Sequence, residues 1–188
     1  MIARSPAGRG RALDLAVAFG LGALYVVLLL RTVGDLGYAR DEGFYFQAAQ
    51  SYGRWFDALW HAPKAALAQR AVDAAWATNH EHPALVKSLF ALSNLILQGK
   101  HHLFAMEGTS YRFAAMVLAG AGVGLVYLFG ARAEGRIAGL AAAGLLAFLP
   151  RFFFHAHLAC FDVPVVTMWV AVLYAFWKSQ KSTYWAIT

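Results

Sequence analysis

The stretch that decides the fold is "PALVKSLFALSNLILQ", residues 83–98. It is apolar, but it is shorter than the roughly 20 residues that a membrane-spanning helix needs. It also contains the polar residues Lys87 and Asn94. Helical spacing places four of its apolar side chains on one face: Leu85, Leu89, Leu92 and Ile96. This pattern predicts an amphipathic helix lying in the membrane interface rather than a span.

The remaining composition is that of a membrane protein. The 188 residues are 60% hydrophobic and 14% charged, whereas soluble domains carry about 25% charged residues. Four stretches are candidates for crossing a bilayer: residues 15–33, 113–131, 137–154 and 163–177. The first is longer than the apolar core of a signal peptide, so we expect it to be retained as a span. The sequence predicts an all-α integral membrane protein with about four transmembrane helices and further interfacial helices.

The net charge of +6 is explained by the ends of these spans. With residues 83–98 in the interface, basic side chains collect at three cytoplasmic ends: Arg4, Arg9 and Arg11, then Arg132 and Arg136, then Lys178 and Lys181. This distribution satisfies the positive-inside rule and predicts a cytoplasmic N-terminus. The same residues form no basic stripe and no RNA-type motif, which argues against nucleic acid as a partner.

The predicted topology places one long loop, residues 34–110, on the outer face. A short loop near residues 155–162 joins it there. Within the long loop, "YFQAAQSYGRWFDALW" (45–60) and "KAALAQRAVDAAW" (64–76) are typical of short amphipathic helices. A loop of this length with its own helices is more than a connector needs, so we expect it to carry function.

The first polar motif of this face is "RDEGFYFQAA", residues 40–49. Asp41 and Glu42 stand there beside aromatic side chains, among them Tyr45. On one interpretation, Asp41 caps a helix that starts at Gly43. On the other, a partly desolvated carboxylate at the membrane edge gains basicity and acts in proton transfer.

The second motif is "NHEHP", residues 79–83. It lacks the HExxH spacing of a zinc protease. Glu81 and His82 either cap the helix that Pro83 opens or form a polar knot that binds a metal ion or a phosphate.

The third motif is "RFFFHAHLACFDVP", residues 151–164. On a helix His155 and His157 point to nearly opposite faces, whereas in an extended segment they share one. Asp162 directly precedes the last predicted span, where an ionisable residue is costly unless it is used. It is either functional or a simple helix cap. Arg112, just outside the second span, either snorkels to the interface or pairs with one of these acids.

The order of these motifs resembles the type C membrane glycosyltransferases of family 39. That family includes protein O-mannosyltransferases and the aminoarabinose transferases, which use polyprenyl-phosphate sugars. Four segments carry the resemblance over nearly the whole chain: "RDEGFYFQAA", "NHEHPALVKSLFAL", "SYRFAAMVLAGAGVGLVYLFGARAEGRIAGLAAAGLLAFLP" and "FFFHAHLACFDVPVVTMWVAVLYAF". Such enzymes continue for several hundred residues, so we expect residues 1–188 to be the N-terminal portion of a longer membrane module.

The resemblance implies an inverting transfer of a sugar from a polyprenyl-phosphate carrier to a hydroxyl acceptor. Asp41 would be the catalytic base, while Asp162 and Glu81 would arrange the phosphate or a divalent metal ion. The substrate-binding residues implied are Glu42, Tyr45, His82, Lys87, Arg112, Arg151, His155 and His157. Among them, Lys87, His82 and Arg151 are expected to face the departing phosphate.

The resemblance further implies the setting: the bacterial inner membrane, with a periplasmic active site. The expected partners are an undecaprenyl-phosphate sugar, an acceptor protein or cell-envelope glycolipid, and the bilayer itself. Two alternatives come from other classes. One is a small multi-span transporter or metal-handling protein that uses the imidazoles of His80, His82, His101, His102, His155 and His157. The other is a structural membrane subunit in which the acids only make a loop polar.

Overall fold

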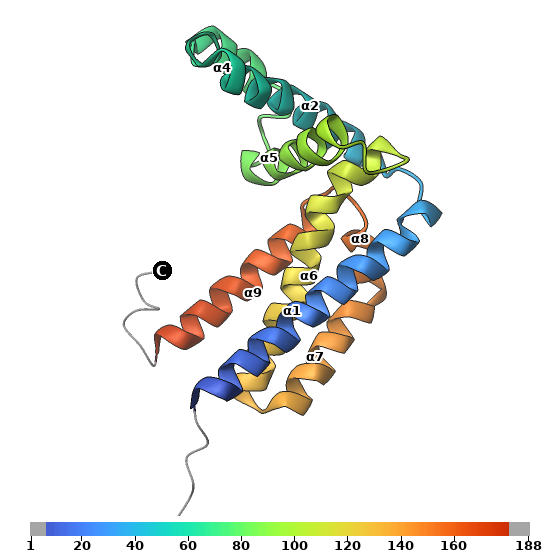
Figure 1. Ribbon diagram of the computed structural model, residues 1–188, viewed down its shortest axis with the longest axis vertical. Helices are drawn as coiled ribbons and strands as arrows, with labels where there is room; N and C mark the ends of the chain where they lie inside the picture. Colours follow the sequence, from blue (N-terminus) through green and yellow to red (C-terminus); the bar gives the residue numbers. More distant parts are fainter. Residues whose placement is uncertain (1–6, 181–188) are drawn as a thin grey trace, which may run out of the picture. The chain divides into compact units, whose positions relative to one another are not determined.

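The computed structural model describes residues 7–180, which contain helices and no β-strand (Figure 1). Arg4 and Lys181, used above in the charge argument, lie outside the described residues. The predicted all-α membrane fold is confirmed. The described chain divides into two compact units, one of apolar helices and one made mainly of the segment 32–116. We describe each unit by itself.

The apolar unit contains the helices that are candidates for crossing the membrane. Its members are α1 (Ala7–Thr32) up to Arg31, α6 (Glu107–Ala133) from Val117 onward, α7 (Arg136–Phe148), α8 (Pro150–Ala156) and α9 (Asp162–Ser179). Two described helical segments, Gly10–Asp35 and Glu107–Ala133, are long and apolar enough to span a bilayer. They contain the first two predicted spans.

Helices α1 and α6 pack through glycines. A Cβ atom on Gly22 would lie 2.7 Å from the carbonyl oxygen of Gly120, and one on Gly124 would lie 2.8 Å from that of Ala18. Such close backbone approach is possible only with small residues. Because residue 18 faces 124 and residue 22 faces 120, the two helices are antiparallel. The chain therefore leaves α1 and enters α6 at the same end of the pair, as expected if residues 83–98 do not form a span.

At the opposite end of this unit, an ion pair connects α1 to α7. Arg136, the first residue of α7, donates from Nε to Asp14 Oδ1 at 2.7 Å and from Nη2 to the carbonyl oxygen of Gly10 at 3.3 Å. The start of α1 and the turn between α6 and α7 thus lie together. This places Arg11 of the first predicted basic cluster and Arg136 of the second at one end of the unit.

The third predicted span is broken. Helix α7 ends at Phe148, Leu149 is extended, and α8 starts at Pro150 with its axis bent by 67°. The reason is Pro150, which has no N–H to donate to the preceding turn and disfavours helical backbone in the residue before it. Helix α9 covers the fourth predicted span, but it is not among the described helices that are long and apolar enough to cross a membrane. That span stays a prediction.

The second unit contains the segment from Thr32 to Met116 together with His157–Phe161. Its helices are η1 (Val33–Asp35), α2 (Arg40–His61), α3 (Pro63–Ala66), α4 (Gln69–Trp76), α5 (Ala84–Ser93), the π-helix η2 (Asn94–Lys100) and the first turns of α6. Of the two amphipathic stretches predicted in the loop, the first is one helix that begins earlier, at Arg40, whereas the second is divided into α3 and α4 at residues 67–68.

Helix α5 packs against α2 with the face opposite to its leucines. Val86, Phe90 and Ala91 are buried, whereas Leu85 and Leu92 are exposed. An exposed row of leucines beside a buried face is what an interfacial helix presents to lipid. The stretch quoted first is thus a short amphipathic helix, as its pattern predicts.

Candidate active site

The two neighbouring acids at the start of α2 have different surroundings. Glu42 is fully buried, and its carboxylate accepts four hydrogen bonds. Asp41 is exposed, and no hydrogen bond or ion pair joins its side chain to any described residue. Helix α2 begins at Arg40, so Asp41 is inside the first turn instead of capping a helix at Gly43.

Arg112 of α6 is the main partner of Glu42. Its Nε and Nη2 atoms each donate to one carboxylate oxygen at 2.7 Å, and its side chain is 1% exposed. Nη2 also donates to the carbonyl oxygen of Gly37 at 2.7 Å, and the guanidinium lies 5.0 Å from the ring centre of Tyr38. A fork-shaped cation suits this two-point contact. Of the two roles considered for Arg112, the structure shows the pairing with an acid.

Glu42 also holds the short segment His157–Phe161 in this unit. The backbone N–H of Ala159 donates to Glu42 Oε1 at 2.9 Å. Oε2 accepts the N–H of Ala39 at 2.9 Å, which satisfies an otherwise unpaired group at the start of α2. With these contacts both carboxylate oxygens are fully used. Glu42 and Arg112 therefore hold α2, α6 and the segment before α9 together, and the substrate contacts predicted for them stay predictions.

His157 is likewise internal. Its side chain is fully buried, and Nε2 lies 2.7 Å from the hydroxyl oxygen of Thr32. Its neighbour in the motif, His155, belongs to the other unit, where Nδ1 lies 3.3 Å from Asp162 Oδ2. The two histidines thus have different partners and do not form a chelating pair.

Three aromatic rings meet at the end of this segment. Phe161 lies 4.9 Å from Tyr45 and 5.7 Å from His82, measured between ring centres, and Tyr45 lies 5.7 Å from His82. Asp41 precedes Tyr45 by four residues, so the two share one face of α2. The exposed acid is therefore one helical turn from a cluster that contains His82 of the second motif.

The second motif forms a tight polar turn before α5. Asn79 has a left-handed backbone with φ of 55°. Its Nδ2 donates to Glu81 Oε1 at 2.7 Å, and the same nitrogen lies 3.3 Å from His82 Nδ1. A groove of about 450 Å³ lies beside the turn and is lined by Tyr52, Trp76, His80, Glu81, His82, Pro83 and Ala84. The side chains of Glu81 and His82 make no capping hydrogen bond to α5.

The charge of Glu81 is stabilised by this turn. A hydrogen bond from its own backbone N–H lowers the pKa of Glu81, and His82, His80 and the Asn79 amide lower it further. Lys87 lies behind the turn, fully buried, and donates to the backbone oxygen of Asn79 and, at 3.3 Å, to its Oδ1. Its ammonium is thus occupied by the protein, which favours a supporting role over the predicted contact with phosphate.

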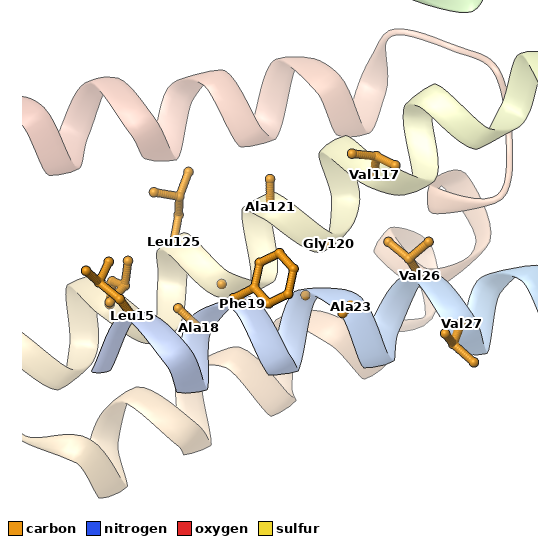
Figure 2. Close-up of a pocket in the computed structure, with 13 residues that line it drawn as sticks. Leu15, Ala18, Phe19, Ala23, Val26, Val27, Val117, Gly120, Ala121 and Leu125 are labelled. Atoms are coloured by element: carbon orange, nitrogen blue, oxygen red, sulfur yellow. The ribbon is translucent and has the colours of Figure 1, made fainter. Parts of the chain in front are cut away.

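The remaining predicted residues lie in the apolar unit. Asp162 begins α9 and is exposed, and Arg151 is exposed on α8. A separate groove of about 600 Å³ runs between α1 and α6 and is lined only by apolar residues and glycines. Figure 2 shows Phe19 and Val26 of α1 on one side of it and Leu125 of α6 on the other. Its surface suits an aliphatic chain, not a polar group.

Comparison with known protein families gives one match. A family model described as "Dolichyl-phosphate-mannose-protein mannosyltransferase" matches residues 82–188, more than half of the chain. The match starts at His82 and continues through α9. The chain belongs to this mannosyltransferase family. No curated protein and no solved structure matches it.

Membership supports the resemblance drawn from the motifs. It makes the chain a member of a family of membrane glycosyltransferases that use a polyprenyl-phosphate sugar. Asp41 and Glu42 lie before the matched residues, so their roles stay predictions. The predicted role of Asp162 in arranging the phosphate near Asp41 also stays a prediction, because the two acids belong to different units.

A metal role for Glu81 also stays a prediction. The Asn79 amide N–H points at Glu81 Oε1 and competes with a cation for that oxygen. The imidazole nitrogens of His80 and His82 lie 3.9 and 3.7 Å from the carboxylate oxygens. The hydrogen bond that this carboxylate accepts from a neighbouring side chain is thus the one from the Asn79 amide.

Sequence reasoning missed three parts of this candidate site: Asn79, the Ala159 N–H and Phe161. Asn79 carried a signal, because asparagine is among the few residues that adopt left-handed backbone readily. The Ala159 N–H carried none, since a backbone donor is invisible in side-chain patterns. Phe161 was visible only as one of many aromatic residues.

Proposed function

We propose that this protein is an inverting glycosyltransferase whose catalytic base is Asp41. The hydroxyl oxygen of the acceptor attacks the anomeric carbon, and the bond from that carbon to the phosphate oxygen breaks. The proton of the hydroxyl passes to Asp41, and the bonding electron pair leaves with the polyprenyl phosphate. Attack from the side opposite the leaving group inverts the anomeric configuration.

The proposal depends mainly on the different surroundings of Asp41, which is exposed, and Glu42, which is buried. Glu42 is saturated with hydrogen bonds, so it has no lone pair left for a substrate. Those bonds fix the first turn of α2 and with it the direction of the adjacent, exposed Asp41. A rigid first turn that presents one free carboxylate is what a positioned base requires.

The neighbouring turn supplies groups for the sugar and its phosphate. Tyr45, His82 and Phe161 offer aromatic surface one turn from Asp41. The imidazole of His82 is a candidate hydrogen-bond donor to the departing phosphate, where negative charge builds up in the transition state. Glu81 stays ionised beside it and would orient sugar hydroxyls.

The apolar unit, taken by itself, supports a donor that is linked to a lipid. The groove between α1 and α6 matches an isoprenoid tail in polarity, and undecaprenyl phosphate is the carrier we propose. The basic residues at the joined ends of α1 and α7 support a cytoplasmic location for those ends. The acceptor hydroxyl, on a protein or a cell-envelope glycolipid, would then be periplasmic.

The transporter or metal-handling alternative relied on clustered imidazoles, but His155 and His157 contact different partners in different units. His80 and His82 belong to the turn before α5 and surround Glu81.

Two experiments test the proposal. Transfer from synthetic polyprenyl-phosphate sugars to hydroxyl acceptors is followed in proteoliposomes, and the anomeric configuration of the product is read by NMR. We expect inversion, and retention would rule out single-step attack.

Separately, with Cys160 replaced, single cysteines at positions 41, 81 and 134 are exposed to an impermeant maleimide in intact cells. Labelling at 41 and 81 but not at 134 supports the periplasmic face, and the reverse pattern contradicts it.

A further inference from the structure

Lys87 is a buried cation whose donors point at a single residue. Its side chain is fully buried, its Nζ lies 5.5 Å from the ring centre of Tyr52, and both of its hydrogen bonds go to Asn79. Among the described residues, no carboxylate lies within ion-pair distance of this ammonium. Burial lowers the pKa of Lys87. Burying an ammonium without a carboxylate partner costs folding free energy, so we ask which neighbouring group it holds in place.

What Lys87 fixes is the orientation of the Asn79 amide. An ammonium group can only donate hydrogen bonds, so the amide oxygen of Asn79 has to face it. The amide nitrogen then has to point the other way, toward Glu81 Oε1 at 2.7 Å and His82 Nδ1 at 3.3 Å. The two ends of an amide usually have to be assigned from their partners, and here the ammonium on one side and the Glu81 carboxylate on the other require the same orientation.

The orientation of Asn79 in turn fixes the proton on His82. Because an amide N–H faces Nδ1, this ring nitrogen has to accept a hydrogen bond. In the neutral imidazole the proton is then on Nε2. The ring itself is held by Tyr45 and Phe161. The carboxylate of Glu81 lies 3.7 Å from Nδ1, too far for a hydrogen bond that would draw the proton to that nitrogen.

We propose that Lys87 is a positioning residue that, through Asn79, sets His82 in the tautomer with its proton on Nε2. One part of this inference rests on the proposed function: the Nε2 proton of His82 forms a hydrogen bond to the phosphate of the sugar donor. The tautomer itself does not depend on that function. Lys87 acts on this phosphate from a distance and never touches it.

The test is the ¹⁵N spectrum of the His82 imidazole at mildly alkaline pH. The full chain is labelled with ¹⁵N-histidine in lipid nanodiscs, and the signals are assigned by their loss in His82→Gln. We expect a protonated Nε2 and an unprotonated Nδ1. The decisive variant is Asn79→Asp, which keeps an acceptor for Lys87 but presents an acceptor to His82. It should move the proton to Nδ1 or give the doubly protonated ring.

Three more variants separate this effect from the fold. Lys87→Met removes the donor and should give a mixture of tautomers, whereas Lys100→Met removes an exposed lysine and should change nothing. Asn79→Gly, which tolerates a left-handed backbone, should also lose the single tautomer. A wild-type signal with the proton on Nδ1, or an unchanged spectrum in Asn79→Asp, overturns the proposal. The spectra need no donor or acceptor, so they decide it even if the transfer reaction fails.

Discussion

Glu42 and Arg112, 70 positions apart in the sequence, form a doubly hydrogen-bonded ion pair that is closed to solvent. The pair ties α2 to α6, and through Gly37 and Ala159 it also ties in the loop before α2 and the segment before α9. Every atom of Glu42 that can accept a hydrogen bond is used, while Asp41 next to it is exposed. The function proposed for Asp41 depends on this framework.

Removing one partner of the pair should be strongly destabilising, because it leaves the other charge buried and unpaired. We expect Arg112→Met to lower the free energy of unfolding by about 3 kcal/mol or more, measured by chemical denaturation in detergent. The double variant Glu42→Gln/Arg112→Met should be more stable than Arg112→Met alone, because no charge is left unpaired. Equal stability of Arg112→Met and the wild type would contradict the structural role.

The glycine contact between α1 and α6 gives a second prediction, with a control glycine on α1 that lies outside the contact. A Cβ atom at position 120 would lie 2.6 Å from the carbonyl oxygen of Gly22, whereas one at Gly20 would meet nothing within 4 Å. Gly120→Ala should therefore push the helices apart and cost about 1–3 kcal/mol. Gly20→Ala should leave the unfolding temperature unchanged or slightly raised. Equal effects of the two variants would show that α1 and α6 do not pack this way.

The lowered pKa of Glu81 makes stability depend on pH in a definite direction. A carboxyl group whose pKa is lower in the folded state than its ordinary 4.5 stabilises the fold above that pH. The contribution is lost as the pH falls through the folded pKa. The difference in unfolding temperature between wild type and Glu81→Gln should be constant near neutral pH and shrink below about pH 4.5. A difference that grows on acidification would mean that the turn does not stabilise the charge.

Much of this fold follows from periodicity and charge. The short apolar stretch before α6 was separable from a span because Lys87 and Asn94 interrupt it, and the structure shows a helix with an exposed row of leucines. The break at Pro150 was missed because the apolar run continues past it, although proline itself predicts the bend. Whether α9 spans the membrane depends on its neighbours, which composition does not describe.

The candidate site was less predictable than the fold. The sequence indicates Asp41 and Glu42 together as candidates, but it does not show which of the two side chains is buried. That depends on Arg112, which is distant in sequence and whose pairing was only one of two alternatives. Lys87 was assigned to phosphate because lysines often bind it, whereas in the fold an asparagine with left-handed backbone takes up its donors.

The most direct test of the central claim is the transfer rate of Asp41→Asn, measured with a polyprenyl-phosphate sugar in proteoliposomes. Asparagine keeps the size of the side chain but cannot accept the proton of the hydroxyl. We expect the rate to fall by roughly 10²-fold or more, with an unchanged unfolding temperature because Asp41 is exposed. The matched control is Asp35→Asn, another exposed acid of the same unit, which should stay active. A wild-type transfer rate in Asp41→Asn would contradict the role of Asp41 as the base.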